Sequence, residues 1–86
     1  MGGVKTLSSL FCLLKKLMRE NDWTYSDLAT LADVSNSTIY KTLQGSRTTV
    51  NRNILNLVEE IGEDPQKFSK KYQEFRVAKR KELLNI

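Results

Sequence analysis

Apolar and polar positions repeat along this chain with the period of an α-helix, in successive segments separated by Asp, Asn, Gly or Pro. The first segment, residues 6–20, has one apolar face at the three- and four-residue spacing of a buried helix. Its members are Leu7, Leu10, Phe11, Leu14, Leu17 and Met18. The pair Asn21-Asp22 ends this helix. Because runs of β-branched residues are scarce and the chain has 4 Gly and 1 Pro, we predict an all-α fold.

The central stretch, residues 24–45, reads as two short helices joined by a tight turn. Leu28, Ala29 and Ala32 of the first helix face the second, and the small alanines allow a close approach. On the second helix, Val34 and Ile39 complete the contact. The outward side of that second helix carries four hydrogen-bonding side chains with no apolar residue between them: Asn36, Ser37, Tyr40 and Lys41.

Local signals fix where these two helices begin. Thr24 followed by Asp27 three residues later forms a capping box, and Ser35 can cap the second helix. The residue before each cap is apolar and has an apolar partner five residues on, which predicts a hydrophobic staple at both starts. Asp33 lies where the turn needs a left-handed backbone, a conformation that Asp tolerates better than most residues.

Two further helices follow. Residues 50–61 carry a buried face made by Val50, Ile54, Leu57, Val58 and Ile61, with Thr49 as a possible cap and Gly62 at the end. Asp64 followed by Pro65 predicts a cap and the first position of a fifth helix. That helix aligns Phe68, Tyr72 and Phe75, which we interpret as core or dimer contact rather than a platform for stacked bases.

Charge is distributed unevenly over the 86 residues, whose net charge is +4. Residues 65–86 hold seven basic and two acidic side chains, a net +5, whereas residues 1–64 have a net charge of −1. The basicity that favours a polyanionic partner therefore lies in the tail, which is where we expect extra phosphate contacts. We divide the chain into a four-helix domain, residues 1–64, and a fifth helix with a basic tail, residues 65–86.

Composition excludes several classes of protein. With one Cys and no His, the chain has neither a disulfide framework nor a Cys/His zinc cluster, and we expect Cys12 to be a small buried hydrophobe. No catalytic triad, Gly-rich phosphate loop or pair of cleft carboxylates can be assembled, so we predict neither enzyme nor cofactor. No run is long enough to span a membrane and no signal peptide is evident, so we expect a cytoplasmic protein.

The central stretch resembles the Cro-type phage-repressor helix-turn-helix family, the lambda-repressor-like DNA-binding domains. The resemblance runs from about residue 14 to about residue 65 and rests on LKKLMREND, SDLATLADVSNSTIYKTLQG and VNRNILNLVEEIGED. It implies a five-helix bundle with a central helix-turn-helix. The chain departs from the family at Asp22 and Asp33, usually Gly, and at Thr42, usually aliphatic. Met18 and Leu43 stand where the family often has a buried Arg–Glu pair between the first and third helices, and apolar replacement of such a pair is commonly neutral or stabilising.

The resemblance implies direct readout of double-stranded DNA, with the second motif helix in the major groove. By position, the base-facing residues are Asn36, Ser37, Tyr40 and Lys41. Asn36 suits adenine, Lys41 suits guanine, Ser37 suits a base or a phosphate, and Tyr40 suits a thymine methyl group. The candidates for contact with the DNA backbone are Tyr25, Ser35, Thr38, Arg47, Thr48, Thr49 and Asn51. A solvated turn would also explain the polarity of residues 46–49, and this alternative stays open.

One such helix reads only a few base pairs, so we expect a homodimer on an inverted-repeat operator. The tail is the candidate dimer or partner contact, through Phe68, Tyr72, Phe75, Leu83 and Leu84. The function implied is that of a transcriptional regulator, a repressor of phage or mobile-element type. The alternative is a protein-binding module on the same fold, such as an antitoxin-like protein or an anti-repressor. The net charge of residues 1–64 and the apolar end of the tail favour that alternative, and the polar face of the second motif helix opposes it.

Overall fold

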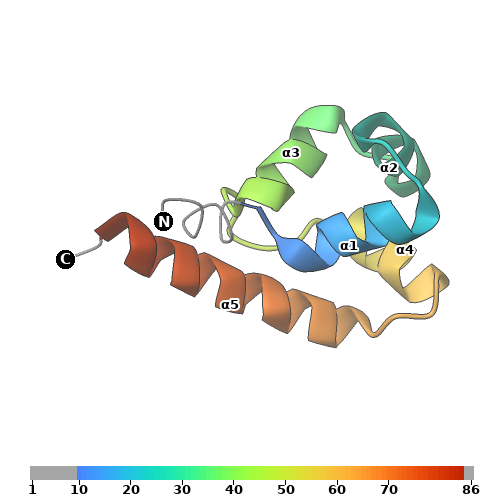
Figure 1. Cartoon of the computed structure of the whole chain (residues 1–86). Coiled ribbons are helices and arrows are strands. Elements are labelled where there is room, and N and C mark those ends of the chain that lie inside the picture. Colours follow the sequence, from blue (N-terminus) through green and yellow to red (C-terminus); the bar gives the residue numbers. More distant parts are fainter. Residues whose placement is uncertain (1–9, 85–86) are drawn as a thin grey trace.

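The computed structural model describes residues 10–84, and within this range it contains five α-helices and no strand. They are α1 (Cys12–Asn21), α2 (Tyr25–Ala32), α3 (Asn36–Gln44), α4 (Arg52–Glu60) and α5 (Pro65–Leu84). In Figure 1, α2 and α3 form the upper part of the molecule, α5 runs along the lower edge, and α1 and α4 lie between them. The predicted all-α architecture with a central helix-turn-helix is confirmed.

The starts and ends of α2 and α3 follow the local signals. The Thr24 hydroxyl accepts from the Asp27 N–H at 3.1 Å and the Asp27 carboxylate accepts from the Thr24 N–H at 2.9 Å, which confirms the capping box. Ser35 caps α3 by accepting from the Thr38 N–H at 3.1 Å. Asp33 and Asp22 both adopt the left-handed conformation at φ 58° and end α2 and α1.

One hydrophobic core joins all five helices. Its buried side chains are Phe11, Leu14, Leu17, Met18, Leu28, Ala29, Ala32, Ile39, Leu43, Val50, Ile54, Leu57, Val58, Phe68 and Tyr72. Met18 and Leu43, which replace the family's ion pair, are both buried in this core. Thr42 is also fully buried, and its hydroxyl donates to the Thr38 carbonyl at 2.7 Å, so the buried polar group has a partner.

The prediction that the first helix includes residues 10 and 11 is wrong. Helix α1 begins at Cys12, and Phe11 before it has extended backbone, with its N–H donating to the Leu43 carbonyl at 2.7 Å. The Phe11 ring lies 5.2–5.4 Å from the rings of three α5 aromatics, Phe68, Tyr72 and Phe75. These contacts with α3 and α5 outweigh the local helical pattern. Leu7 and the rest of the predicted start lie outside the described residues, and Cys12 is exposed rather than buried.

The start of the fourth helix also differs from the prediction. Helix α4 begins at Arg52, and its cap is Asn51 rather than Thr49: the Asn51 side-chain oxygen accepts from the Asn53 N–H at 2.7 Å. Val50 remains in the core but precedes the helix and belongs to no helix or strand. Helix α5 begins as predicted at Pro65, with the Asp64 carboxylate accepting from the Gln66 N–H at 2.9 Å.

The prediction that Phe68 and Tyr72 form a dimer contact is wrong, because both residues lie in the core. Both are almost completely buried within their own chain, and Phe75 is half-buried against the same cluster. These aromatic side chains attach α5 to the helix-turn-helix body. The rings of Phe68 and Tyr72 are therefore not available at the surface for a second copy. Leu83 and Leu84, by contrast, are exposed, and their assignment to a partner contact stays a prediction.

Candidate nucleic-acid interface

Helix α3 presents its four predicted base-facing side chains on one exposed surface. Asn36, Ser37, Tyr40 and Lys41 are all exposed, whereas Ile39 and Leu43 on the opposite side are fully buried. Burial of the apolar side therefore determines which side of α3 is free to meet a partner. The amphipathic pattern of this short helix and its N-terminal cap together set the orientation of the polar side chains.

Some of these polar groups already have protein partners. The Asn36 side-chain amide donates to the Ser26 hydroxyl at 3.3 Å, and the Ser35 and Thr38 hydroxyls lie 3.1 Å apart. An amide nitrogen carries two protons and a hydroxyl has two acceptor lone pairs, so each group keeps capacity for an external partner. Asn36 can thus still make a two-point contact with a base edge through its oxygen and its second amide proton.

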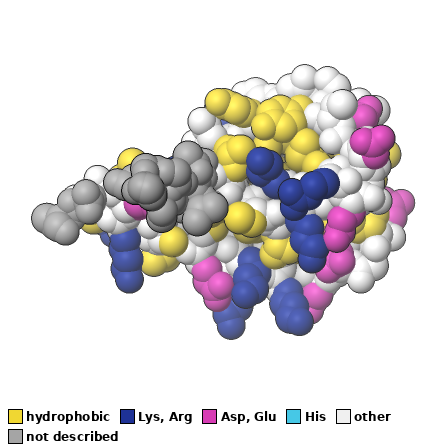
Figure 2. All heavy atoms as spheres, viewed as in Figure 1, with side chains coloured by type: hydrophobic (Ala, Val, Ile, Leu, Met, Phe, Trp, Pro, Cys, Tyr) yellow, Lys and Arg dark blue, Asp and Glu magenta, His cyan; other side chains and the backbone are white. Residues whose placement is uncertain are grey.

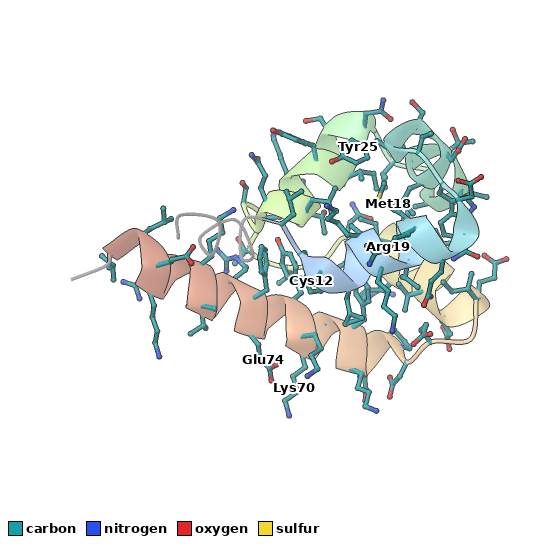
Figure 3. The ribbon with its side chains drawn as sticks, viewed as in Figure 1. Cys12, Met18, Arg19, Tyr25, Lys70 and Glu74 are labelled. Atoms are coloured by element: carbon teal, nitrogen blue, oxygen red, sulfur yellow. The ribbon has the colours of Figure 1, made fainter. Side chains whose placement is uncertain are left out.

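Two exposed tyrosines extend this surface from α3 onto α2. The rings of Tyr25 and Tyr40 have centroids 6.4 Å apart, and the two side chains are 38% and 48% exposed. Figure 3 labels Tyr25 next to α3, in agreement with the short distance between its ring and that of Tyr40. The sequence predicted contacts for each tyrosine separately but did not predict that they form a pair.

The C-terminal end of α3 leads into a hollow with the chemistry of an anion site. This hollow, of about 310 Å³, is lined by Lys41, Ser46, Arg47, Thr48 and Thr49, which supply two cationic side chains and three hydroxyl groups. Among the described residues, the Arg47 Nε is buried without a hydrogen-bond partner. Arg and hydroxyl side chains are the usual partners of DNA phosphates. The structure therefore brings Lys41 together with the predicted loop residues.

Helix α5 holds the loop that forms this hollow. Gln73 donates to the Thr48 carbonyl at 2.9 Å, and the Tyr72 hydroxyl donates to the Arg47 carbonyl at 2.7 Å. Arg76 donates through Nε to the Gly45 carbonyl at 3.0 Å and through a guanidinium nitrogen to the Thr48 carbonyl at 3.5 Å. Each hydrogen bond joins residues at least 25 positions apart in the sequence.

Lys79 adds a further connection at the end of α3. Its ammonium group donates to the Gln44 carbonyl at 2.8 Å and lies 5.6 Å from the centre of the Phe75 ring. A cation next to the last carbonyls of a helix is favourable because the C-terminal end carries partial negative charge. The sequence analysis did not predict Gln73, Arg76 or Lys79 as site residues. The positive charge of Arg76 and Lys79 suggested contacts with DNA phosphate rather than with backbone carbonyls.

Burial raises the pKa of the Tyr72 phenol, and the nearby Arg76 together with the hydrogen bond to the Arg47 carbonyl oppose that rise. Tyr72 therefore stays protonated and continues to donate its hydrogen bond throughout the neutral pH range. The loop is thus held by a neutral phenol, an amide and a guanidinium.

The remaining predicted backbone contacts lie around the same region. Asn51 caps α4 through its side-chain oxygen, which leaves its amide nitrogen as the group for a phosphate. Asn53, at the start of α4, donates to the Asp33 carbonyl at 3.3 Å and so ties α4 to the turn between α2 and α3. That contact was not predicted, because Asn53 and Asp33 are separated by 20 residues.

An all-helical bundle whose second motif helix has an exposed polar side defines a helix-turn-helix domain. Residues 14–58 match the Cro/C1-type HTH DNA-binding domain, and the chain belongs to this family. The family is regulatory and non-catalytic and acts in DNA-binding transcription regulation. No curated protein and no solved structure shows a significant match to the chain. Within residues 10–84, no helix has both the length and the apolarity needed to cross a membrane.

Proposed function

We propose that this protein is a sequence-specific regulator that represses transcription by binding an inverted-repeat operator as a homodimer. The observation that supports this most strongly is the continuity between the exposed side of α3 and the cationic hollow. Lys41 belongs to both, since it is exposed on α3 and also lines the hollow with Arg47. One surface thus combines groups suited to base edges with groups suited to phosphates.

In this proposal α3 enters the major groove. Asn36, Ser37, Tyr40 and Lys41 read bases, and the adjacent loop lies along the backbone. The backbone contacts come from Tyr25, Ser35, Thr38, Arg47, Thr48, Thr49 and Asn51. A dimer with two such helices about 34 Å apart matches one turn of duplex DNA. Occupation of a promoter excludes polymerase, which favours repression, and the likeness to phage repressors favours a phage or mobile-element setting in the cytoplasm.

The first test is a fluorescence titration of random duplex DNA at two salt concentrations. Phosphate contacts release counterions, so affinity should fall steeply as salt rises. A binding curve that is absent, or that does not change with salt, would favour the protein-binding alternative instead. Lys15→Ala, which removes an exposed cation from α1, is a matched control that should leave the salt dependence unchanged.

Two substitutions separate base readout from backbone contact. The operator is first selected from a random pool of duplexes, which also gives its symmetry and half-site spacing. Lys41→Ala should weaken binding chiefly to that operator, by about 1–3 kcal/mol. Arg47→Ala should weaken all duplexes alike, provided that its thermal unfolding matches the wild type. Equal losses on every sequence for both variants would contradict the proposed orientation of α3.

A further inference from the structure

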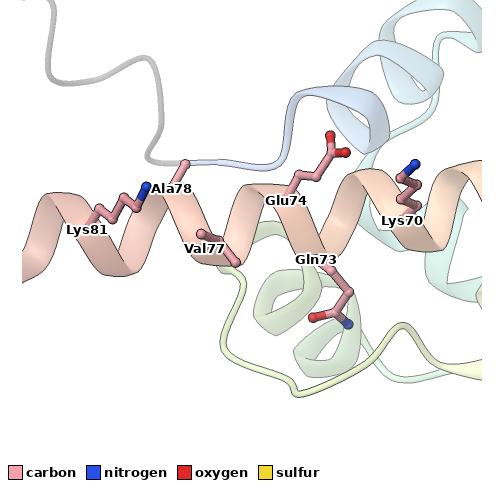
Figure 4. Close-up of a pocket in the computed structure, with 6 residues that line it drawn as sticks. All are labelled: Lys70, Gln73, Glu74, Val77, Ala78 and Lys81. Carbon is pink, nitrogen blue, oxygen red and sulfur yellow. The ribbon is translucent and has the colours of Figure 1, made fainter.

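Two tyrosines differ from the other large apolar side chains that are exposed within residues 10–84. Val77, for example, lies alone in a shallow groove on α5 that charged side chains also line (Figure 4). Tyr25 and Tyr40 are the aromatic members of this exposed set, and their rings lie together. Figure 2 shows hydrophobic side chains at the surface over α3, the helix that we propose enters the major groove. The DNA surface therefore includes an apolar part.

The spacing of the two rings allows one small apolar group to contact both. The ring centroids lie 6.4 Å apart and the ring planes are inclined at 45°. Carbon atoms in van der Waals contact lie about 4 Å apart. Because twice that distance exceeds the separation of the centroids, a single methyl carbon can lie within contact distance of both rings at once. The side chains are 38% and 48% exposed, so such a group can reach them from solvent.

The ring pair lies next to a proposed base-reading amide. Tyr25 is the first residue of α2, directly after the capping residue Thr24. The next residue, Ser26, accepts from the Asn36 side-chain amide at 3.3 Å. Tyr40 follows Asn36 by four positions, so the two residues lie one helical turn apart on the same side of α3. The start of α2 is thus joined to the polar side of α3 by two contacts, a hydrogen bond and a pair of rings.

The major groove of duplex DNA offers one kind of apolar group to such a pair. The faces of the bases are stacked on one another, so only the base edges are accessible. Those edges present hydrogen-bond donors and acceptors, and the apolar exception is the C5-methyl group of thymine. A cytosine methylated at C5 carries the same group on the same ring atom. Two aromatic rings on a groove-binding surface therefore complement the C5-methyl group of a pyrimidine.

We propose that Tyr25 and Tyr40 together bind the C5-methyl group of one pyrimidine in each half of the operator. This rests on the proposed function and adds a specificity-determining residue from α2, because Tyr25 is otherwise assigned only to the DNA backbone. The Tyr25 hydroxyl can still donate to a phosphate while its ring contacts the methyl group. Since the contact is apolar, the protein should select the methyl group itself, on thymine and on 5-methylcytosine alike.

The test uses the full chain and the operator selected from the random pool, with each thymine replaced in turn by deoxyuridine. This replacement removes one methyl group and keeps every hydrogen-bonding group of the base pair. Fluorescence anisotropy should show that the affinity of the wild type falls about fourfold at one thymine position of each half-site, the loss expected when one methyl group stays in water. At that position, 5-methylcytosine should bind about fourfold more tightly than cytosine, which separates the methyl group from the rest of the thymine.

Substitutions of the two tyrosines test whether both rings are needed. Tyr25→Ala and Tyr40→Ala should each bring the ratio of affinities for thymine and uracil close to one, at protein concentrations that saturate the DNA. Tyr25→Phe and Tyr40→Phe keep the rings and should keep the ratio. Leu31→Ala, which removes a 49% exposed apolar side chain elsewhere on α2, is the matched control and should also keep it.

Two results would overturn this site. One is an operator in which no thymine position responds to loss of its methyl group. The other is an unchanged ratio in either alanine variant, which would show that the corresponding ring does not contact the methyl group. Either result, obtained with salt-dependent binding of DNA intact, would leave the proposed function in place. An absence of DNA binding would overturn the proposed function and this inference with it, so the two failures are distinguishable.

Discussion

The two ends of α3 are organised differently. Its N-terminal end begins at a local cap, because the Ser35 hydroxyl accepts from the Thr38 N–H at 3.1 Å, and the contacts that reach it from Ser26 and Asn53 are longer, at 3.3 Å. Its C-terminal end is held from a distance, because Arg76 and Lys79 of α5 donate to the carbonyls of Gly45 and Gln44. The start of α3 is therefore set mainly by a local cap, whereas the loop proposed to contact phosphates depends on a helix much later in the chain.

Gly45→Ala should have the largest effect on the C-terminal end. Gly45 has φ +76°, and an added Cβ would lie 2.8 Å from the Phe75 Cε2 atom. The left-handed backbone and the overlap with the ring together should lower the free energy of unfolding by about 2–4 kcal/mol. Urea unfolding measures this loss. Gly62→Ala is the control: Gly62 also has positive φ, +93°, but its Cβ would meet nothing within 4 Å. An equal loss in both variants would show that contact with α5 contributes nothing.

Arg76→Ala should come next, with a loss of about 1.5 kcal/mol, because it removes charged donors from two loop carbonyls. The same variant should weaken binding to all duplexes alike, since the loop and not the base-facing end changes. Hydrogen exchange of the amides of residues 45–49 should accelerate. Arg80→Ala, an exposed cation on the same helix, should do neither.

The matching change at the other end of α3 is Ser35→Ala. It should cost about 1 kcal/mol of stability through loss of the cap. Hydrogen exchange of the amides of residues 45–49 should accelerate only as far as the lower global stability of the variant requires. If Ser35→Ala and Arg76→Ala gave the same exchange pattern, the two ends of α3 would be one unit and the contrast between them would fail.

Tyr72→Phe should have the smallest effect at neutral pH, about 0.5 kcal/mol, because it removes only one neutral hydrogen bond, that to the Arg47 carbonyl. Its pH dependence is diagnostic. Since burial raises the pKa of Tyr72 above 10.0, the folded state holds the phenol proton more tightly than the unfolded state. The contribution of Tyr72 is therefore complete below pH 10.0 and is lost as pH rises above it.

Urea unfolding of both proteins from about pH 8 to about pH 11 measures this loss. The wild type and Tyr72→Phe should converge in stability at the alkaline end, because only the wild type carries the titrating phenol at this position. Subtraction of the two curves removes the titration of the lysines, which both proteins share. Curves that remain parallel across the range would mean that Tyr72 has the same pKa in the folded and unfolded states.

The contrast between the ends of α3 also explains how far the sequence could predict the molecule. The caps at Thr24 and Ser35, the left-handed Asp33 and the start of α5 at Pro65 depend on residues within one helical turn, so their patterns were sufficient. The exposed polar side of α3 followed from the same helical period. All four proposed base-facing residues lie on this polar side, so the sequence alone was enough to predict that they are exposed together.

The errors arose where distant segments decide the local structure. Phe11 lies in a helical pattern but adopts an extended backbone, because its N–H bonds Leu43 and its ring fills the aromatic cluster of α5. Arg76 and Lys79 look like ligands for DNA phosphate in sequence, yet they donate to backbone carbonyls of the same chain. No periodic pattern carries information about contacts between residues so far apart in the sequence.

The loop beside α3 is ordered before any DNA arrives. The carbonyls of Gly45, Arg47 and Thr48 all accept hydrogen bonds from α5 side chains, so folding has already restricted these residues. Fixing the backbone of a free residue costs about 1–2 kcal/mol. A loop without these hydrogen bonds would have to meet that cost when it binds the duplex, and its phosphate contacts would be correspondingly weaker. The affinity of this surface for DNA therefore depends on a helix that need not touch DNA at all.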